Sequence, residues 1–182
     1  SERTHPAAIE RLAKQVFAHY STSFDTILAF NIPKVRAFMH LDTIFTQVDV
    51  GVFLIHSNLD PQIQTYEIKR TDSTSDKLTV KPINKPLATV LETYLKTKIT
   101  LIPCGGDDTV SNDREQWNDG ANTLAIAPGE VIVYERNHIT NAILKQHGIK
   151  VHTMPSSELS RGRGGPRCMS MPFIRETIQR KD

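Results

Sequence analysis

The stretch FMHLDT, residues 38–43, sets a histidine and an aspartate two positions apart, directly ahead of a β-rich segment at residues 43–50. Because side chains alternate along an extended chain, His40 and Asp42 would point to the same side of a strand. Histidine exchanges protons near neutral pH, and the aspartate would add an anion beside it. Taken alone, the stretch is also open to a second interpretation, in which His40 lies at a strand edge with its hydrogen bonds made and Asp42 belongs to a turn.

A second polar stretch, SRGRGGPRCMSMP at residues 160–172, surrounds Cys168 with glycines and three arginines. A thiolate is the nucleophilic form of cysteine, and cations that fold toward the sulfur would lower the pKa of the thiol. Arg163 could also hold a carboxylate with its planar fork. A basic surface loop with an incidental cysteine is the alternative. A cysteine beside a base is the arrangement that activates a thiol, so His40 and Cys168 indicate nucleophilic catalysis if the fold brings them together.

The remaining pattern predicts an α/β protein in which strands come in pairs separated by single helices, without a repeated sequence motif. Apolar residues spaced three and four apart predict a helix over residues 6–20, with its apolar face in the core. Further helices are expected at residues 86–95 and 113–117 and from Asn137 to Gly148. Trp117 and Cys104 are expected in the core. Short β-rich runs predict strands at residues 24–30, 43–50, 52–56, 64–69, 78–80, 99–102, 122–127, 131–134 and 149–152.

Composition argues against several classes of protein. The 182 residues carry a formal net charge of +2, which indicates no nucleic-acid partner. No apolar run approaches the roughly 18 residues of a membrane span, and no basic leader supports secretion. Two cysteines fit a reducing cytoplasm, and seven histidines without metal-ligand spacing argue against a metal site. The GGDD sequence at residues 105–108 lacks the Lys-Ser/Thr of a phosphate-binding loop, so a turn is expected there.

Three ordered motifs together resemble one known family. FMHLDT at residues 38–43, REQWNDGAN at residues 114–122 and RGRGGPRCMSMP at residues 161–172 resemble characteristic stretches of the arginine deiminases, and the resemblance runs from residue 1 to about residue 175. It implies a pentein fold, a five-part pseudo-symmetric α/β propeller of which this chain would form about half. Residues 1–182 would then be the C-terminal part of a single catalytic domain, with no internal boundary and no cofactor.

The resemblance also implies a role for each site residue. Cys168 matches the nucleophile that attacks the guanidinium carbon of L-arginine. His40 matches the acid and base that protonates the departing ammonia and then activates water. Asp42 matches a carboxylate that grips the guanidinium group. Arg163 and, at the edge of the resemblance, Arg3 match arginines that bind the α-carboxylate of the substrate.

Members of that family are much longer than this chain. The resemblance places a second guanidinium-binding aspartate and a glutamate partner of the histidine in the missing N-terminal half. The first residue is serine rather than methionine, which also suggests a fragment. We therefore expect L-arginine as substrate and the N-terminal half as a partner. We also expect homo-oligomers, a cytoplasmic location, and little or no activity from this chain alone.

Two alternatives stay open at this point. The chain could belong to another guanidino-modifying enzyme, such as an agmatine deiminase, a dimethylarginine hydrolase or an amidinotransferase. Arg163 argues against agmatine, which has no carboxylate to bind. The chain could instead be an inactive fragment that serves only as an assembly or interaction module.

Overall fold

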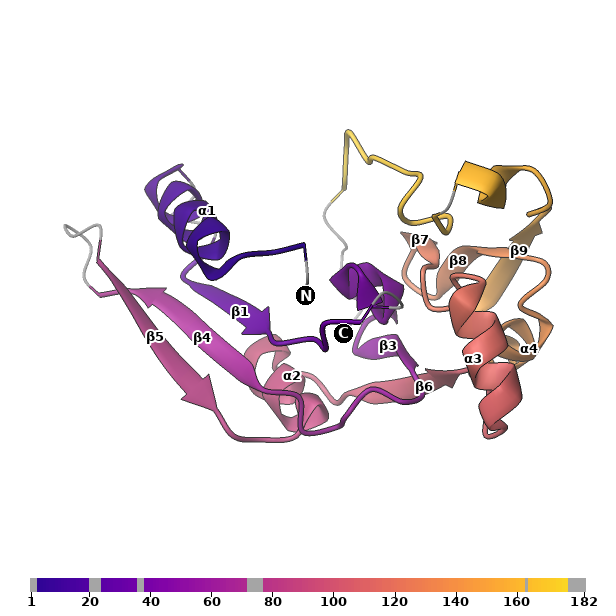
Figure 1. Ribbon diagram of the computed structural model, residues 1–182, viewed down its shortest axis with the longest axis horizontal. Helices are drawn as coiled ribbons and strands as arrows, with labels where there is room; N and C mark the ends of the chain where they lie inside the picture. Colours follow the sequence, from indigo (N-terminus) through magenta and orange to yellow (C-terminus); the bar gives the residue numbers. More distant parts are fainter. Residues whose placement is uncertain (1–2, 20–23, 36–37, 72–76, 163, 177–182) are drawn as a thin grey trace.

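The computed structural model describes residues 3–19, 24–35, 38–71, 77–162 and 164–176, and it has an elongated α/β architecture (Figure 1). The helices are α1 (Pro6–His19), α2 (Leu87–Leu95), α3 (Thr109–Trp117) and α4 (His138–Gln146), with short 3₁₀ turns η2 (Leu41–Thr43) and η3 (Leu159–Gly162). The strands are β1 (Thr26–Phe30), β2 (Phe45–Asp49), β3 (Val52–His56), β4 (Thr65–Arg70), β5 (Leu78–Ile83), β6 (Thr100–Cys104), β7 (Leu124–Ala127), β8 (Glu130–Tyr134) and β9 (Lys150–Met154). Within the described ranges, no helix has the length and apolar character needed to cross a membrane.

The described strands form three sheets of three strands each, in the orders β1-β4-β5, β2-β3-β6 and β7-β8-β9. The first sheet is antiparallel throughout. In each of the other two, an antiparallel pair is followed by a third strand that runs parallel to the second. A parallel neighbour needs a crossover, which α2 supplies before β6 and α4 supplies before β9. The same arrangement of three strands therefore occurs in both sheets, although β4 and β5 also lie between β3 and β6 in the chain and the sequence repeats no motif.

Apolar clusters join the three sheets in a row. α1 covers the first sheet through Ala13 and Phe17. Leu87 of α2 belongs to a second cluster, which reaches the middle sheet. Leu54 of the middle sheet and Leu144 of α4 share a third cluster with the last sheet. Because burial of apolar surface is the main stabilising term in folding, the middle sheet is fixed from both sides, and η2 directly precedes its first strand.

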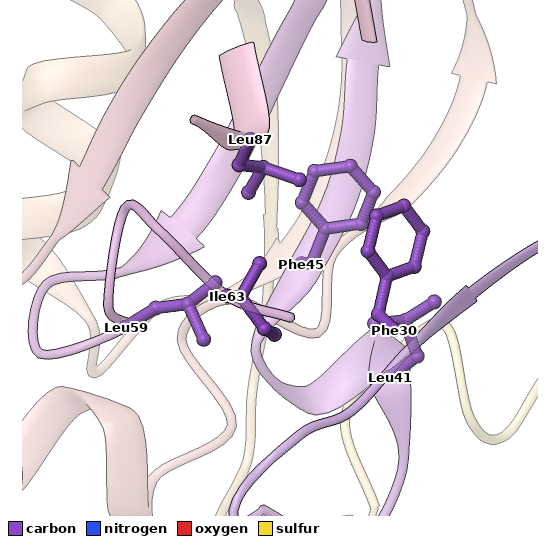
Figure 2. A pocket seen from close by; sticks show the side chains of 6 residues that line it. All are labelled: Phe30, Leu41, Phe45, Leu59, Ile63 and Leu87. Carbon is purple, nitrogen blue, oxygen red and sulfur yellow. The ribbon is translucent and has the colours of Figure 1, made fainter. Parts of the chain in front are cut away.

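A small apolar hollow lies behind η2 (Figure 2). The side chains that line it come from β1, η2, β2, α2 and the connection between β3 and β4, namely Phe30, Leu41, Phe45, Leu59, Ile63 and Leu87. None of these six can ionise, so the hollow offers packing rather than chemistry. Leu41 is the residue between His40 and Asp42, and its contact with this apolar wall anchors the turn that carries them.

Most of the predicted elements are confirmed. α1 lies within the predicted helix, and β7 and β8 form the expected hairpin. Residues 105–108 form a turn that leads into α3. Asn137 lies at the N-cap position of α4 although its side chain makes no capping hydrogen bond, and Gly148 follows the helix with a φ of +79°. These elements depend on local periodicity, caps and turn residues, which are visible in sequence.

Three expectations are wrong. His40 is extended, but residues 41–43 turn into η2 instead of continuing a strand, so alternation along a strand does not place Asp42. α3 begins at Thr109 rather than at residue 113, because the Asp108 carboxylate caps it by accepting from the Ser111 backbone N–H at 2.8 Å. Trp117 is 57% exposed and does not belong to the core.

Candidate active site

Three of the predicted site residues lie together. One ligand atom each from His40, Asp42 and Cys168 forms a group in which all atoms lie within 4.8 Å of one another. The Cys168 thiol donates to Oδ2 of Asp42 at 3.5 Å. His40 and Cys168 are exposed, and Asp42 is half-buried, so the group is open to a ligand from solvent. The fold thus brings η2 into contact with the loop after β9, although the two segments are 126 positions apart in the sequence.

Burial raises the pKa of the Cys168 thiol, and the negative charge of Asp42 raises it further. A hydrogen bond with the Asn122 side chain acts in the opposite direction. The expectation that nearby arginines lower this pKa is not met by the described side chains. Arg161 forms its ion pair with Glu158, and Arg167 lies 3.8 Å from the Asp42 carboxylate instead. The thiol is therefore held in its neutral form while the site contains no added cation.

Asp42 has one carboxylate oxygen engaged and one available. Oδ2 accepts from the thiol and lies 3.8 Å from Arg167 Nη1. Oδ1 is buried and has no hydrogen-bond partner among the described residues. A buried acceptor without a donor is costly, so this oxygen is well suited to a ligand that brings an N–H group. A cationic N–H group would also relieve the negative charge that suppresses the thiolate.

Two amide side chains from the stretch at residues 114–122 hold the site together. Gln116 Nε2 donates to the Thr43 carbonyl at 2.6 Å. Asn122 Nδ2 donates to the Asp42 carbonyl at 2.8 Å, and Asn122 Oδ1 accepts from the Cys168 N–H at 2.9 Å. Sequence reasoning recognised this stretch as characteristic but gave neither residue a role. The three amide residues of this short stretch, Gln116, Asn118 and Asn122, were the available signal.

The Cys168 loop also rests on the last sheet, past which it runs in Figure 1. The Tyr134 hydroxyl at the end of β8 donates to the Gly164 carbonyl at 2.7 Å and to Met169 Sδ at 3.7 Å. The Met169 N–H donates to the Gly165 carbonyl at 3.2 Å, which closes a turn around Cys168. Hydrogen bonds therefore hold the loop on both sides of Cys168 in the sequence.

The other two predicted site residues are Arg163 and Arg3. Arg163 lies outside the described residues. Arg3 is exposed in the segment before α1. Binding of a substrate carboxylate by these two arginines stays a prediction.

The donor types of the site also allow a metal ion. A thiolate, an imidazole and a carboxylate are all zinc ligands, and His40, Asp42 and Cys168 offer one of each. Spacing rules missed this possibility because the ligands come from two distant segments. The site residues fit the cofactor-free thiol chemistry of the family resemblance equally well.

Fold and site together define an α/β protein with an exposed thiol, an imidazole and a carboxylate in one cluster. The family model for arginine deiminase matches residues 1–175. The chain belongs to the arginine deiminase family.

Curated relatives agree with this assignment. An arginine deiminase of Clostridium perfringens is 54% identical over 178 residues, and one of Borrelia garinii subsp. bavariensis is 56% identical over 178 residues. Each alignment covers 98% of this chain but only 43% of the relative, so the chain spans less than half the length of the proteins it matches.

A solved structure shares the fold. An amidinotransferase from Microseira wollei, described as part of the saxitoxin biosynthetic pathway, superposes with a TM-score of 0.59 at 18% identity. The match covers 97% of this chain and 41% of that structure. At this identity the likeness concerns the fold alone, and it supports the pentein type.

Proposed function

We propose that this chain provides the cysteine-bearing part of an enzyme that hydrolyses L-arginine to L-citrulline and ammonia in arginine degradation. The observation that carries the proposal is the single cluster formed by His40, Asp42 and Cys168, with their ligand atoms within 4.8 Å of one another. A nucleophile next to a base is the arrangement that covalent catalysis needs. The names of the curated relatives give the substrate class.

In the first step, the guanidinium group of arginine donates to Oδ1 of Asp42, the buried oxygen that has no other partner within the described ranges. The bound cation offsets the charge of Asp42, so the pKa of the Cys168 thiol falls and its proton passes to His40, which leaves a thiolate beside a protonated imidazole. The sulfur attacks the guanidinium carbon, and the C–N bond to one terminal nitrogen breaks. His40 gives a proton to that nitrogen, which leaves as ammonia. The product is a covalent amidino-thioether on Cys168.

In the second step, water replaces the sulfur. His40, now neutral, takes a proton from the water as it attacks the same carbon. The C–S bond breaks, the sulfur leaves as a thiolate, and the carbon keeps the oxygen of the water. Citrulline departs and gives its excess proton to solvent, and His40 returns its proton to the sulfur, which restores the thiol. The steps balance without a cofactor or an external oxidant.

Arg163 and Arg3 are proposed to bind the α-carboxylate of arginine through paired N–H groups. This role separates arginine from agmatine, which lacks the carboxylate. A comparison of the two as substrates distinguishes the proposal from an agmatine deiminase. Equal rates with agmatine would remove both arginines from substrate binding.

The active form is proposed to need the length of the relatives that this chain does not span. The three sheets would form part of a five-part propeller, which the further length of the relatives would close. The missing part would supply the second aspartate on the guanidinium and the glutamate beside His40 that the family resemblance implies. When catalytic groups act as a unit, removal of some of them lowers the rate by far more than the sum of their separate contributions would suggest. A homo-oligomeric state and a cytoplasmic location stay predictions.

The function is tested by measuring citrulline from L-arginine with two proteins. One is this chain, and the other is a protein of the relatives' full length that contains it. We expect turnover from the longer protein only. Turnover by residues 1–182 alone at the full rate would contradict the need for the missing part. No turnover by either protein would contradict the proposed function.

Replacement of Asp42 by asparagine should lower the pKa of the Cys168 thiol. The carboxylate raises this pKa by its charge and by accepting the thiol hydrogen bond, and a neutral amide removes the charge and can offer only a weaker acceptor. The rate of alkylation by iodoacetamide should therefore reach its midpoint at a lower pH than in the unaltered chain.

Two controls accompany the Asp42→Asn measurement. Replacement of the exposed Asp107 by asparagine should leave the midpoint unchanged. Cys104 is an internal control, because burial raises the pKa of its thiol to about 12 and should keep it unlabelled. A midpoint for Asp42→Asn that stays in place or rises would contradict the electrostatic account of the site.

A further inference from the structure

Asn122 connects the two segments that carry the site. It lies in the connection between α3 and β7, and its side chain is fully buried, with 0% exposure. Its amide nitrogen donates to the Asp42 carbonyl at 2.8 Å, and its amide oxygen accepts from the Cys168 N–H at 2.9 Å. Its own backbone carbonyl accepts from the Arg167 N–H at 3.3 Å. One residue therefore satisfies backbone groups on both sides of the site.

Gly165 has no side chain and so lets the Cys168 loop pack closely against Asn122. A Cβ added to this glycine would lie 2.6 Å from Cβ, O and Oδ1 of Asn122, closer than side chains approach one another. Its φ lies outside the left-handed region, so the need for glycine here is one of space and not of backbone conformation. The close contact allows the loop to reach the Asn122 amide.

We propose that Asn122 is a positioning residue for the reaction, because its amide fixes the Cys168 backbone to the Asp42 backbone and thereby sets where the sulfur lies relative to the guanidinium-binding carboxylate. This inference rests on the proposed function, and it adds a residue to which neither the family resemblance nor the comparisons give a role. Displacement of a nucleophile by about 1 Å costs roughly 100-fold in rate, so a rigid bridge of this kind has a large effect on turnover.

A second effect of Asn122 acts on the sulfur itself. A hydrogen bond from its side chain lowers the pKa of the Cys168 thiol, against the larger effect of burial and that of Asp42. Loss of the amide removes this effect and also frees the sulfur from its place beside Asp42, so the pH at which the thiolate forms should change. A purely structural asparagine would not change this pH, so alkylation separates positioning from packing.

The control is Asn137, another buried asparagine whose amide nitrogen donates to a backbone carbonyl, that of Asn118, at 3.2 Å. The variants are Asn122→Ala and Asn137→Ala, which each remove one such amide without adding charge. Gly165→Ala is a third variant, which keeps Asn122 but pushes the loop away from it. It is also the fallback if Asn122→Ala does not fold.

Two readouts are used. The first is the pH midpoint of Cys168 alkylation by iodoacetamide in residues 1–182, which needs no turnover and so tests the inference even if the proposed function fails. The second is kcat and KM for L-arginine in the longer protein. Thermal unfolding of every variant is followed in parallel.

We expect Asn122→Ala and Gly165→Ala to shift the alkylation midpoint and to lower kcat by about 100-fold, with a much smaller change in KM. Asn137→Ala should lose stability to a similar degree but keep both the midpoint and kcat. The inference is overturned if folded Asn122→Ala and Gly165→Ala keep the unaltered midpoint and kcat. It is also overturned if Asn137→Ala changes them equally.

Discussion

Replacement of Cys168 by alanine should abolish citrulline formation by the longer protein while leaving its folding nearly intact. The sulfur is the only atom proposed to bond to the substrate, so its loss removes the covalent route, at a cost on the order of 10⁴-fold or more in kcat. The side chain is exposed, and its truncation leaves no cavity. Citrulline assays and thermal unfolding of the same preparation check both parts of the result.

The matched control is Cys104→Ala. Cys104 is 1% exposed and packs in the cluster between the middle and last sheets. Its truncation should lower the unfolding temperature, since a buried side chain leaves a cavity, but it should spare turnover. The two cysteines should therefore give opposite results. Turnover that survives in Cys168→Ala would remove this residue from the role of nucleophile.

The second large effect concerns stability. Glu115→Ala should destabilise the chain by an amount on the order of 3 kcal/mol, because buried donors lose their acceptor. The Glu115 side chain is fully buried and caps the start of α4: it accepts from the Ile139 N–H at 3.0 Å, the Thr140 N–H at 2.8 Å and the Thr140 hydroxyl at 2.6 Å. A carboxylate at a helix N-terminus is also favoured by the helix dipole.

Urea denaturation of residues 1–182 measures this effect. The control is Glu135→Ala, an exposed glutamate ahead of the same helix, whose loss should change stability by less than about 0.5 kcal/mol. Equal midpoints for Glu115→Ala and the unaltered chain would show that α4 does not depend on the buried carboxylate.

Local sequence signals predicted the helices and hairpins well, because apolar spacing and turn residues involve only residues that are close in the sequence. The apolar spacing in α1 and the turn between β7 and β8 are examples. An extended chain at residues 40–42 was a reasonable hypothesis because residues 39–42 alternate apolar and polar side chains as a strand does. In the fold, Leu41 instead turns toward the apolar hollow of Figure 2 and starts η2. Tertiary packing therefore overrode the local pattern.

The residues of the site could be predicted, but their arrangement could not. His40, Asp42 and Cys168 stand in conspicuous motifs, yet only the fold brings them within 4.8 Å of one another. The pKa of Cys168 was expected to fall because the loop is rich in arginine. It rises because the sulfur is partly buried and because the negative charge of Asp42 lies beside it. The sign of such a shift depends on distances that no sequence pattern contains.

The bridging role of Asn122 was invisible for a related reason. An asparagine is a common loop residue, and nothing in its neighbours indicates which backbone groups it will meet. Its partners, Asp42 and Cys168, lie 80 residues before it and 46 residues after it. Long-range amide bridges of this kind become evident only when burial and hydrogen bonds are known.

The central claim is that Cys168 forms a covalent bond to the carbon of a guanidinium held by Asp42. The most direct measurement is rapid acid quenching of the longer protein during turnover of isotopically labelled L-arginine, followed by peptide mass spectrometry. We predict a labelled adduct on the Cys168 peptide with the mass of arginine less ammonia. Labelled citrulline formed at the normal rate, with that peptide unmodified at every quench time, would contradict the account.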